Sequence, residues 1–256
     1  MQKAFDFGAG AELAAMRDRL RQAASPLPGI PRRAPVGQMV KSMLGCRTRD
    51  TVSLAAYNRL LVRYPGWSEL AAAPAKAVEA MIADVTFPES KAEQIAQALQ
   101  LIGKSHPDFD LSFLAQWPVE RALAWLEELP GVGRKVAAST LNFSTLAMPA
   151  FVLDTHVLRI LRHCGFISAK TDDALPAYAI VMPALAGWSA AELAEFHVLL
   201  KHLGQSICRK GRENCTICPL DRVCREALRK ARAARSSNTE TGVSRSPAGR
   251  LRPRQA

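Results

Sequence analysis

The chain has 256 residues, of which 48% are apolar and 22% charged. These proportions exclude a disordered, collagen-like or disulfide-dominated protein and are typical of a globular one. Lys and Arg total 34 against 23 acidic residues, a net charge of +11, which favours a polyanionic partner such as nucleic acid. The tail from Arg229 to Ala256, with eight bases and one acid, carries +7 of that charge. The body is therefore only mildly basic, at +4.

The sequence gives no sign of export or of a membrane span. The first twenty residues mix charged and small apolar side chains and lack the continuous apolar core of a signal peptide. The longest apolar stretch, Ala177 to Trp188, is interrupted by Pro183 and is too short to cross a bilayer. We therefore expect a cytoplasmic protein without membrane contact. In a reducing compartment its six cysteines are not expected to form disulfides.

The body is predicted to be helical nearly throughout, which places the chain in the all-α class. Apolar residues recur at spacings of three and four within 52–61, 95–102 and 157–161. The predicted helix N-caps are Asp50, Ser68, Ser90 and Asp154. Helices are expected to break near Pro65, Pro74, Pro88, Pro107, Pro130, Pro149, Pro176 and Pro183. The spacing of these helix-breaking residues predicts about ten to twelve short helices.

The segment Leu129–Ala137 reads LPGVGRKVA and is predicted to join two helices. Gly131 and Gly133 permit a tight turn whose backbone N–H groups, with the N-terminus of the next helix, suit one phosphate. Lys135 lies on the first turn of that helix, where the helix dipole disfavours a cation and favours the neutral amine. A neutral lysine is a nucleophile for Schiff-base chemistry. A plain helix–helix turn with a phosphate-binding surface lysine is the alternative.

Asp154 follows Lys135 by nineteen residues, in the stretch Val152–Arg159. A short carboxylate here is a good N-cap for the helix that is expected to begin at Thr155. If the fold brings Asp154 near Lys135, its carboxylate can also stabilise a cationic sugar intermediate or relay protons. The sequence leaves both roles open.

Four cysteines lie within seventeen residues at the spacing C-x6-C-x2-C-x5-C: Cys208, Cys215, Cys218 and Cys224. Thiolates at this range can converge on one soft metal centre. A structural zinc more often has two facing C-x2-C pairs, whereas this spacing has one, so it favours an iron–sulfur cluster over zinc. The other two cysteines, Cys46 and Cys164, lie among apolar residues and are predicted to be buried core thiols.

Together these motifs resemble the endonuclease III family, the helix-hairpin-helix DNA glycosylases that carry a [4Fe-4S] cluster. The resemblance rests on the hairpin ending at Lys135, on Leu153–His156 and on the cysteine spacing. It runs from about Pro35 to Cys224, and the motifs occur in the family's order and spacing.

The resemblance implies a fold of two all-helical lobes. Residues 35–147 would form a six-helix barrel that contains the helix-hairpin-helix. Residues 148–228 would form the other lobe, closed by the [4Fe-4S] loop, with the N-terminal segment 1–34 packed against it. The basic tail, 229–256, has almost no large apolar residues and is expected to be disordered.

The resemblance also implies base-excision DNA repair by a bifunctional glycosylase and AP lyase, acting as a monomer near the nucleoid. Double-stranded DNA with a damaged base or an abasic site would lie between the lobes, with the base flipped out of the duplex. Lys135 would attack the deoxyribose C1′, expel the base and form a Schiff base, and β-elimination would nick the strand. Asp154 matches the family's catalytic aspartate. The base is expected to be an oxidised pyrimidine.

Residues expected to contact DNA come from the hairpin and from the segment 45–50: Gly131, Val132, Gly133, Arg134, Arg47 and Cys46. The family usually has glutamine where we place Cys46, and it fills the gap left by the flipped base. Cys46 is smaller and cannot make the hydrogen bonds of an amide. The loop Thr86–Glu89 also departs from the family pattern, because Pro88 replaces a more flexible turn. Both departures concern the choice of base.

Two alternatives remain at the level of sequence. One is a monofunctional glycosylase for uracil or mismatched bases. The other is a DNA-binding homologue without catalysis, against which the presence of both Lys135 and Asp154 argues.

Overall fold

The computed structural model describes residues 8–24, 29, 31–171 and 173–240. Over these residues the chain forms twelve α-helices, three short 3-10 helices and one pair of two-residue strands. The all-α prediction is therefore confirmed. None of the helices described is long and apolar enough to cross a membrane.

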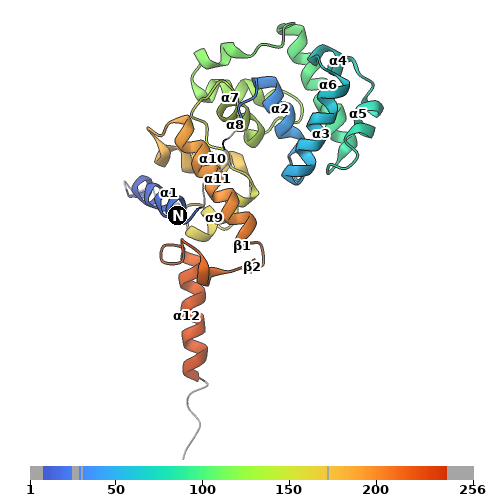
Figure 1. Cartoon of the computed structure of the whole chain (residues 1–256). Coiled ribbons are helices and arrows are strands. Elements are labelled where there is room, and N and C mark those ends of the chain that lie inside the picture. The colour runs from blue at the N-terminus through green and yellow to red at the C-terminus, as the bar shows by residue number, and fades with distance from the viewer. Residues whose placement is uncertain (1–7, 25–28, 30, 172, 241–256) are drawn as a thin grey trace, which may run out of the picture.

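One lobe, at the upper right of Figure 1, contains the consecutive helices α2 to α8. Its elements are α2 (Pro35–Leu44), α3 (Asp50–Arg63), α4 (Trp67–Ala72), α5 (Ala75–Met81), α6 (Pro88–Ser105), η1 (Ser112–Gln116), α7 (Val119–Glu127) and α8 (Arg134–Phe143). Helix α2 is central, since it packs against α3, α6 and α8. Every residue of α2 is buried except Lys41.

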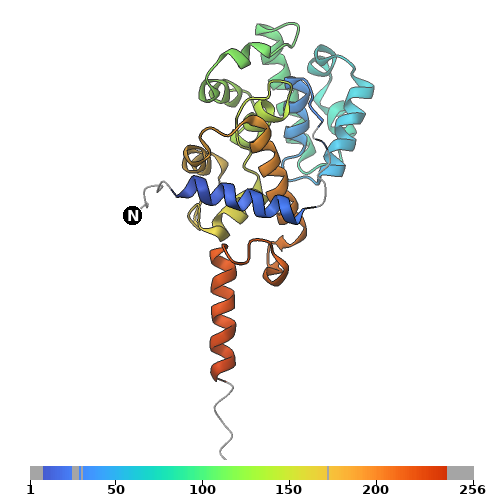
Figure 2. The same cartoon turned by 60° about the vertical axis from the view of Figure 1, so that its left-hand side comes forward.

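The other lobe combines the N-terminal helix with the C-terminal part of the chain. Its elements are α1 (Ala9–Ala23), α9 (Thr155–Cys164), α10 (Ala174–Val181), η2 (Met182–Leu185), α11 (Ala190–Ser206), β1 (Cys208–Arg209), β2 (Arg212–Glu213) and η3 (Cys215–Ile217). Helix α1 crosses α11 (Figure 2). Arg17 of α1 donates to Glu192 of α11 at 2.8 Å and stacks 4.4 Å from the ring of Trp188. Helices α8 and α11 pack together and join the lobes.

Of the four predicted N-caps, only Asp154 is confirmed, since its side chain accepts hydrogen bonds from the first turn of α9. Asp50, Ser68 and Ser90 lie just inside the helices that they were expected to cap. At α6 the reason is Pro88, which occupies the first turn, where its missing N–H has no cost.

Helix α12 (Arg225–Glu240) projects away from the second lobe (Figure 1). The expectation of a disordered tail is therefore wrong for residues 229–240. Ala, Leu, Arg, Lys and Glu dominate the first part of this helix, and they are strong helix formers. Glu226 and Arg229 also form an ion pair at 2.7 Å, one turn apart. The remainder of the predicted tail, 241–256, lies outside the described residues.

Candidate functional site

The predicted hairpin connects α7 to α8. Gly131 has φ +76°, and a Cβ there would lie 2.6 Å from Gln94 Oε1, so both the backbone and the available space require glycine. A Cβ on Gly133 would meet nothing within 4 Å, so this end of the hairpin is open. The side chain of Val132 is buried in the core, so only its backbone can face a ligand.

Arg134 follows the hairpin, but its guanidinium is already engaged. The side chain is 11% exposed and bonds Glu127 at 2.6 Å and Glu120 at 3.3 Å. Its guanidinium carbon lies 4.8 Å from the ring centroid of Tyr178 on α10. Arg134 therefore ties α8 to α7 and α10 through three of its five N–H donors, and the phosphate contact expected of it stays a prediction.

Lys135 extends from the first turn of α8 toward α2. Its Nζ lies 3.5 Å from the backbone oxygen of Ser42, a long contact that leaves the amine only weakly held. Beneath it the hydroxyls of Ser42 and Ser139 are 2.8 Å apart, and Gln38 Nε2 donates to both at 3.1 Å. These hydrogen bonds form a buried polar cluster that joins α2 to α8.

Asp154 lies at the start of α9, where its Oδ1 accepts from the N–H groups of His156 and Val157 at 2.9 Å each. Burial by itself would raise the pKa of Asp154. His197, the Val157 N–H and Lys201 together outweigh burial and lower the pKa. The carboxyl group is therefore held as a carboxylate.

His197 on α11 lies behind this carboxylate, and the sequence analysis missed it. It is buried, and its Nδ1 lies 2.7 Å from the Val152 carbonyl, which can only accept, so Nδ1 carries the proton. Burial lowers the pKa of His197, although Asp154 opposes this. Lys135 also acts on His197 electrostatically. Lys135 of one lobe and Asp154 of the other therefore act electrostatically on the same buried histidine.

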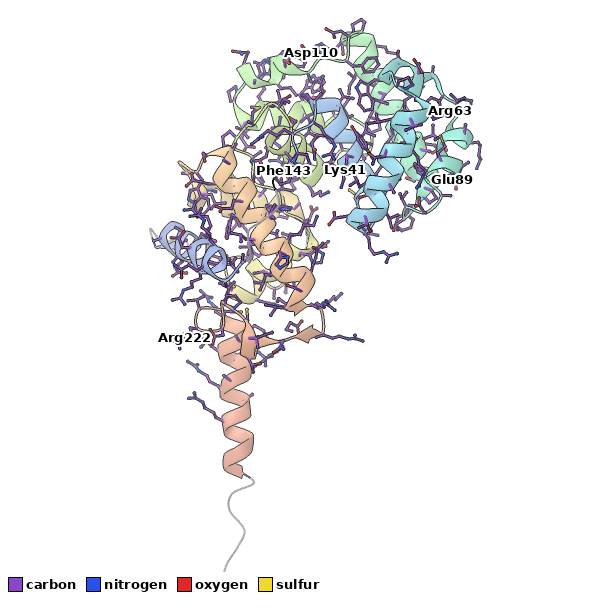
Figure 3. The ribbon with its side chains drawn as sticks, in the orientation of Figure 1. Lys41, Arg63, Glu89, Asp110, Phe143 and Arg222 are labelled. Atoms are coloured by element: carbon purple, nitrogen blue, oxygen red, sulfur yellow. The ribbon has the colours of Figure 1, made fainter. Side chains whose placement is uncertain are left out.

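Further charged residues at the junction of the lobes were not predicted. Lys201 of α11 donates to Asp50 of α3 at 2.8 Å, and Gln205 donates to the other carboxylate oxygen of Asp50 at 3.2 Å. Lys41 of α2 lies between the lobes (Figure 3). None of these residues has a local motif, because the partners are up to 155 positions apart in the sequence.

Cys46 follows the C-terminal end of α2 and is half-buried. Its Sγ turns back toward α2 and lies 3.4 Å from the Ser42 carbonyl oxygen. The next residue, Arg47, has φ +56° and lies over Phe87 of the α5–α6 loop, 5.9 Å from the ring centroid. Phe87 also has a left-handed backbone, φ +57°, and is 58% exposed. Two neighbouring non-glycine residues in this strained conformation are typical of functional loops.

Lys91, a buried residue of α6, holds the loops of Arg47 and Phe87 in place. Its Nζ donates to the carbonyls of Leu44 and Cys46 at 2.8 and 2.7 Å and to Thr48 Oγ1 at 3.0 Å. Thr48 Oγ1 in turn accepts from the N–H of Thr86 at 3.1 Å. Lys91 and Thr48 therefore link the loop of Arg47 to the loop of Phe87 through hydrogen bonds.

The four predicted cysteine ligands follow α11. Cys208 lies on β1, and Cys215, Cys218 and Cys224 follow on the loop that leads to α12. Their thiols are close enough that burial and the neighbouring thiols raise the pKa values of Cys208 and Cys218. Yet in the described part of the chain no three His, Cys, Asp or Glu side chains are placed to hold a single metal ion.

Four thiol side chains close together in sequence supply the soft donor set that an iron–sulfur cluster or zinc takes. Cys164, predicted to be a core thiol, is buried, as expected. It lies beside Cys224, and its hydrogen bond lowers the pKa of Cys224 to about 6.

Comparison with known proteins identifies relatives. Residues 40–182 match the model of the HhH-GPD superfamily base excision DNA repair protein. The chain is 27% identical over 208 residues to Endonuclease III of Thermotoga maritima, covering 80% of this chain and 90% of the relative. It is 28% identical over 193 residues to the DNA glycosylase/AP lyase ROS1 of Arabidopsis thaliana, covering 69% of this chain but only 14% of that much longer protein.

Solved structures have the same fold. A trapped Endonuclease III–DNA covalent intermediate superimposes with a TM-score of 0.71 at 22% identity, covering 87% of this chain and 98% of that one. A thermostable thymine-DNA glycosylase gives a TM-score of 0.68 at 15% identity, covering 86% and 97%. The arrangement of helices is therefore shared with both of these proteins.

Proposed function

Because the chain belongs to the HhH-GPD superfamily of base excision DNA repair proteins, we propose that it is a bifunctional DNA glycosylase and AP lyase whose nucleophile is Lys135. The observation that supports this proposal is that Lys135 and Asp154, from two different lobes, both act electrostatically on the buried His197. Schiff-base chemistry on a sugar requires a weakly held amine and a carboxylate that stabilises positive charge. A protein that only binds DNA has no need of this pair.

The amine of Lys135 bonds to the deoxyribose C1′ while the bond from C1′ to the base breaks, and that electron pair leaves with the base. A proton then passes from the new C–N nitrogen to the ring oxygen, the bond from C1′ to that oxygen breaks, and the nitrogen lone pair forms the C=N bond of a protonated Schiff base. Removal of a proton from C2′ then expels the 3′ phosphate by β-elimination. Asp154, held as a carboxylate by the N-terminus of α9, stabilises the cationic sugar.

Duplex DNA with a damaged base or an abasic site is the proposed substrate, and an oxidised pyrimidine is the proposed base. The open turn at Gly133, with Gly131 and the N-terminus of α8, suits one backbone phosphate. We assign the side chains that enter the duplex to Arg47 and Phe87, because Phe87 is exposed and Cys46 turns inward. An exposed aromatic ring can stack on an unpaired base.

The proposed cofactor is a [4Fe-4S] cluster bound by Cys208, Cys215, Cys218 and Cys224. When bound, it supplies structural order to the loop between β1 and α12 and takes no part in the sugar chemistry. Arg159 supports this loop from α9, since its guanidinium donates to the carbonyl oxygen of Cys208 at 2.7 Å. The proposed domain division is 35–147 for the barrel and 148–228, with 1–34, for the cluster lobe.

Borohydride trapping tests the nucleophile. The wild-type protein, incubated with a duplex that contains one abasic site and with borohydride, is expected to form a covalent adduct, because reduction fixes the Schiff base. Lys135→Ala should form none, whereas Lys76→Ala, which removes an exposed lysine on α5, should form as much as the wild type. The absence of an adduct with the wild type, or an undiminished adduct with Lys135→Ala, would reject the proposal.

Iron analysis tests the cofactor. The purified protein should be brown, absorb visible light and contain about four irons per chain. Cys218→Ser should lower the iron content, whereas Cys46→Ser, which changes a thiol outside the loop, should leave it unchanged. One zinc and no iron per chain would refute the assignment.

A further inference from the structure

Lys41 is a cation in an otherwise buried helix. All nine other residues of α2 are buried, between α3, α6 and α8. The side chain of Lys41 emerges between the two lobes (Figure 3) and is half-buried there. A lysine at such a position costs solvation energy that an apolar residue would not, so stability alone does not explain it.

The ammonium of Lys41 has few partners in the protein. Within the described residues it makes one hydrogen bond, to Ser53 Oγ at 3.3 Å. The carboxylate nearest in sequence, Asp50, is bonded to Lys201 and Gln205 of the other lobe. An ammonium group has three N–H donors, and so two of them remain available to a ligand.

Lys41 shares its surroundings with the proposed nucleophile. Lys135 Nζ contacts the carbonyl of Ser42, the residue next to Lys41. Each of the two lysines therefore reaches the junction from its own helix, α2 or α8. Burial, together with Lys201, Lys135 and Arg33, lowers the pKa of Lys41 to about 8, against the opposing effect of Asp50. The group is thus a proton donor suited to neutral pH.

We propose that Lys41 receives the flipped base and donates its proton to the carbonyl oxygen next to the glycosidic nitrogen, which makes Lys41 the residue that selects the base. This inference rests on the proposed function and names its substrate class. In every pyrimidine a carbonyl oxygen adjoins the glycosidic nitrogen. Adenine has none there. Lys41 therefore favours pyrimidines over adenine as leaving groups.

The proton and electron balance of this step is complete. As Lys135 bonds to C1′, the electron pair of the glycosidic bond leaves with the base, and its negative charge is shared with the adjacent oxygen. That oxygen takes a proton from the Lys41 ammonium, so the base departs neutral and Lys41 becomes a neutral amine. Solvent reprotonates Lys41 before the next turnover.

Two assays separate excision of the base from the lyase step. Single-turnover excision is measured on duplexes that contain thymine glycol, 5-hydroxyuracil, uracil or, as the base without an adjoining carbonyl, adenine, and the lyase step on an abasic duplex with borohydride. Lys41→Met should slow excision of the pyrimidine preferred by the wild type by about 100-fold, the effect of losing a general acid. Its borohydride adduct should persist, which also shows that the variant is folded. Lys76→Met, on the exposed face of α5, is the matched control and should match the wild type in both assays.

The pH dependence gives a second readout. Lys41 must be protonated to act, so wild-type excision should fall as pH rises through about 8. The groups that face it are Asp50 of α3, Lys201 of α11, Lys135 of α8 and Arg33. Lys41→Arg stays charged at all these pH values but cannot release a proton, so it should excise as slowly as Lys41→Met and show no fall in rate near pH 8.

The outcomes distinguish this proposal from the proposed function. Unchanged pyrimidine excision by Lys41→Met, or loss of its borohydride adduct, would overturn the role of Lys41. A wild type that nicks abasic DNA but releases none of the three pyrimidines would overturn it as well. A wild type that forms no adduct at all would instead refute the proposed function.

Discussion

At the scale of single residues, Asp154 combines a structural and a chemical role. The two backbone N–H groups that it caps also hold it as a carboxylate. Because its pKa is lowered in the folded protein, its contribution to stability is present above the unfolded value of 3.8 and is lost as pH falls through the folded value. The cap and the charge are therefore coupled in one side chain.

Substitutions at Asp154 can separate the two roles. Asn caps a helix about as well as Asp, so Asp154→Asn should change the unfolding free energy little while it strongly reduces the single-turnover lyase rate. Asp154→Ala should lose the cap as well, at a cost of about 1 kcal/mol. Urea unfolding and abasic-site cleavage measure these effects. A fully active Asp154→Asn would show that the carboxylate acts only as a cap.

At the scale of elements, Lys91 determines how two loops present Arg47 and Phe87. The C-terminal end of α2 leaves carbonyl groups without helical partners, and Lys91 satisfies those of Leu44 and Cys46 from α6. Burial lowers the pKa of Lys91 to about 8. The unfolded chain therefore binds more protons over about pH 8 to 10, and this group makes stability rise with pH in that window.

Lys91→Met should lower the unfolding free energy by about 1–3 kcal/mol, because it leaves buried carbonyl groups without a donor. The unfolding free energy of this variant should also increase less than that of the wild type as pH rises above about 8. Urea titrations at two pH values measure both effects. Lys104→Met changes an exposed lysine on the same helix and should stay within about 0.5 kcal/mol of the wild type. Equal stability of the two variants would show that Lys91 does not hold the two loops in place.

At the scale of the whole molecule, the charge is unevenly placed. The two lobes hold the proposed chemistry, whereas most of the net charge lies from Arg229 onward, in α12 and the residues beyond it. Helix α12 leaves the body next to the cysteine loop and projects away from the junction of the lobes (Figures 1 and 2). It can therefore add long-range attraction to DNA without contacting the reacting sugar.

A chain that ends at Leu228 should accordingly bind undamaged duplex DNA more weakly, and its affinity should depend less steeply on salt, because fewer counterions are released. The single-turnover rate on an abasic site should be unchanged. Binding isotherms at several salt concentrations, together with that rate, test both statements. A large fall in the rate would show that this segment contributes to the site itself.

The sequence by itself determined what depends on short-range spacing. The glycine hairpin, the cap at Asp154, the cysteine spacing and the helical class all follow from residues close together in the chain, because turns, caps and helical periodicity are local. Some predictions from local sequence were wrong: Ser90 lies inside α6 and does not cap it, and residues 229–240 are helical where disorder was expected.

Only the tertiary structure decided how side chains from distant helices meet. It paired Arg134 with Glu120 and Glu127, turned Cys46 inward and placed Lys41 beside the lysine of α8. Such contacts depend on how α2, α3, α8 and α11 pack, and packing across large sequence separations has no local signature. The chemistry that we propose for the site therefore follows from local motifs, whereas the residue that we propose selects the base has no such motif.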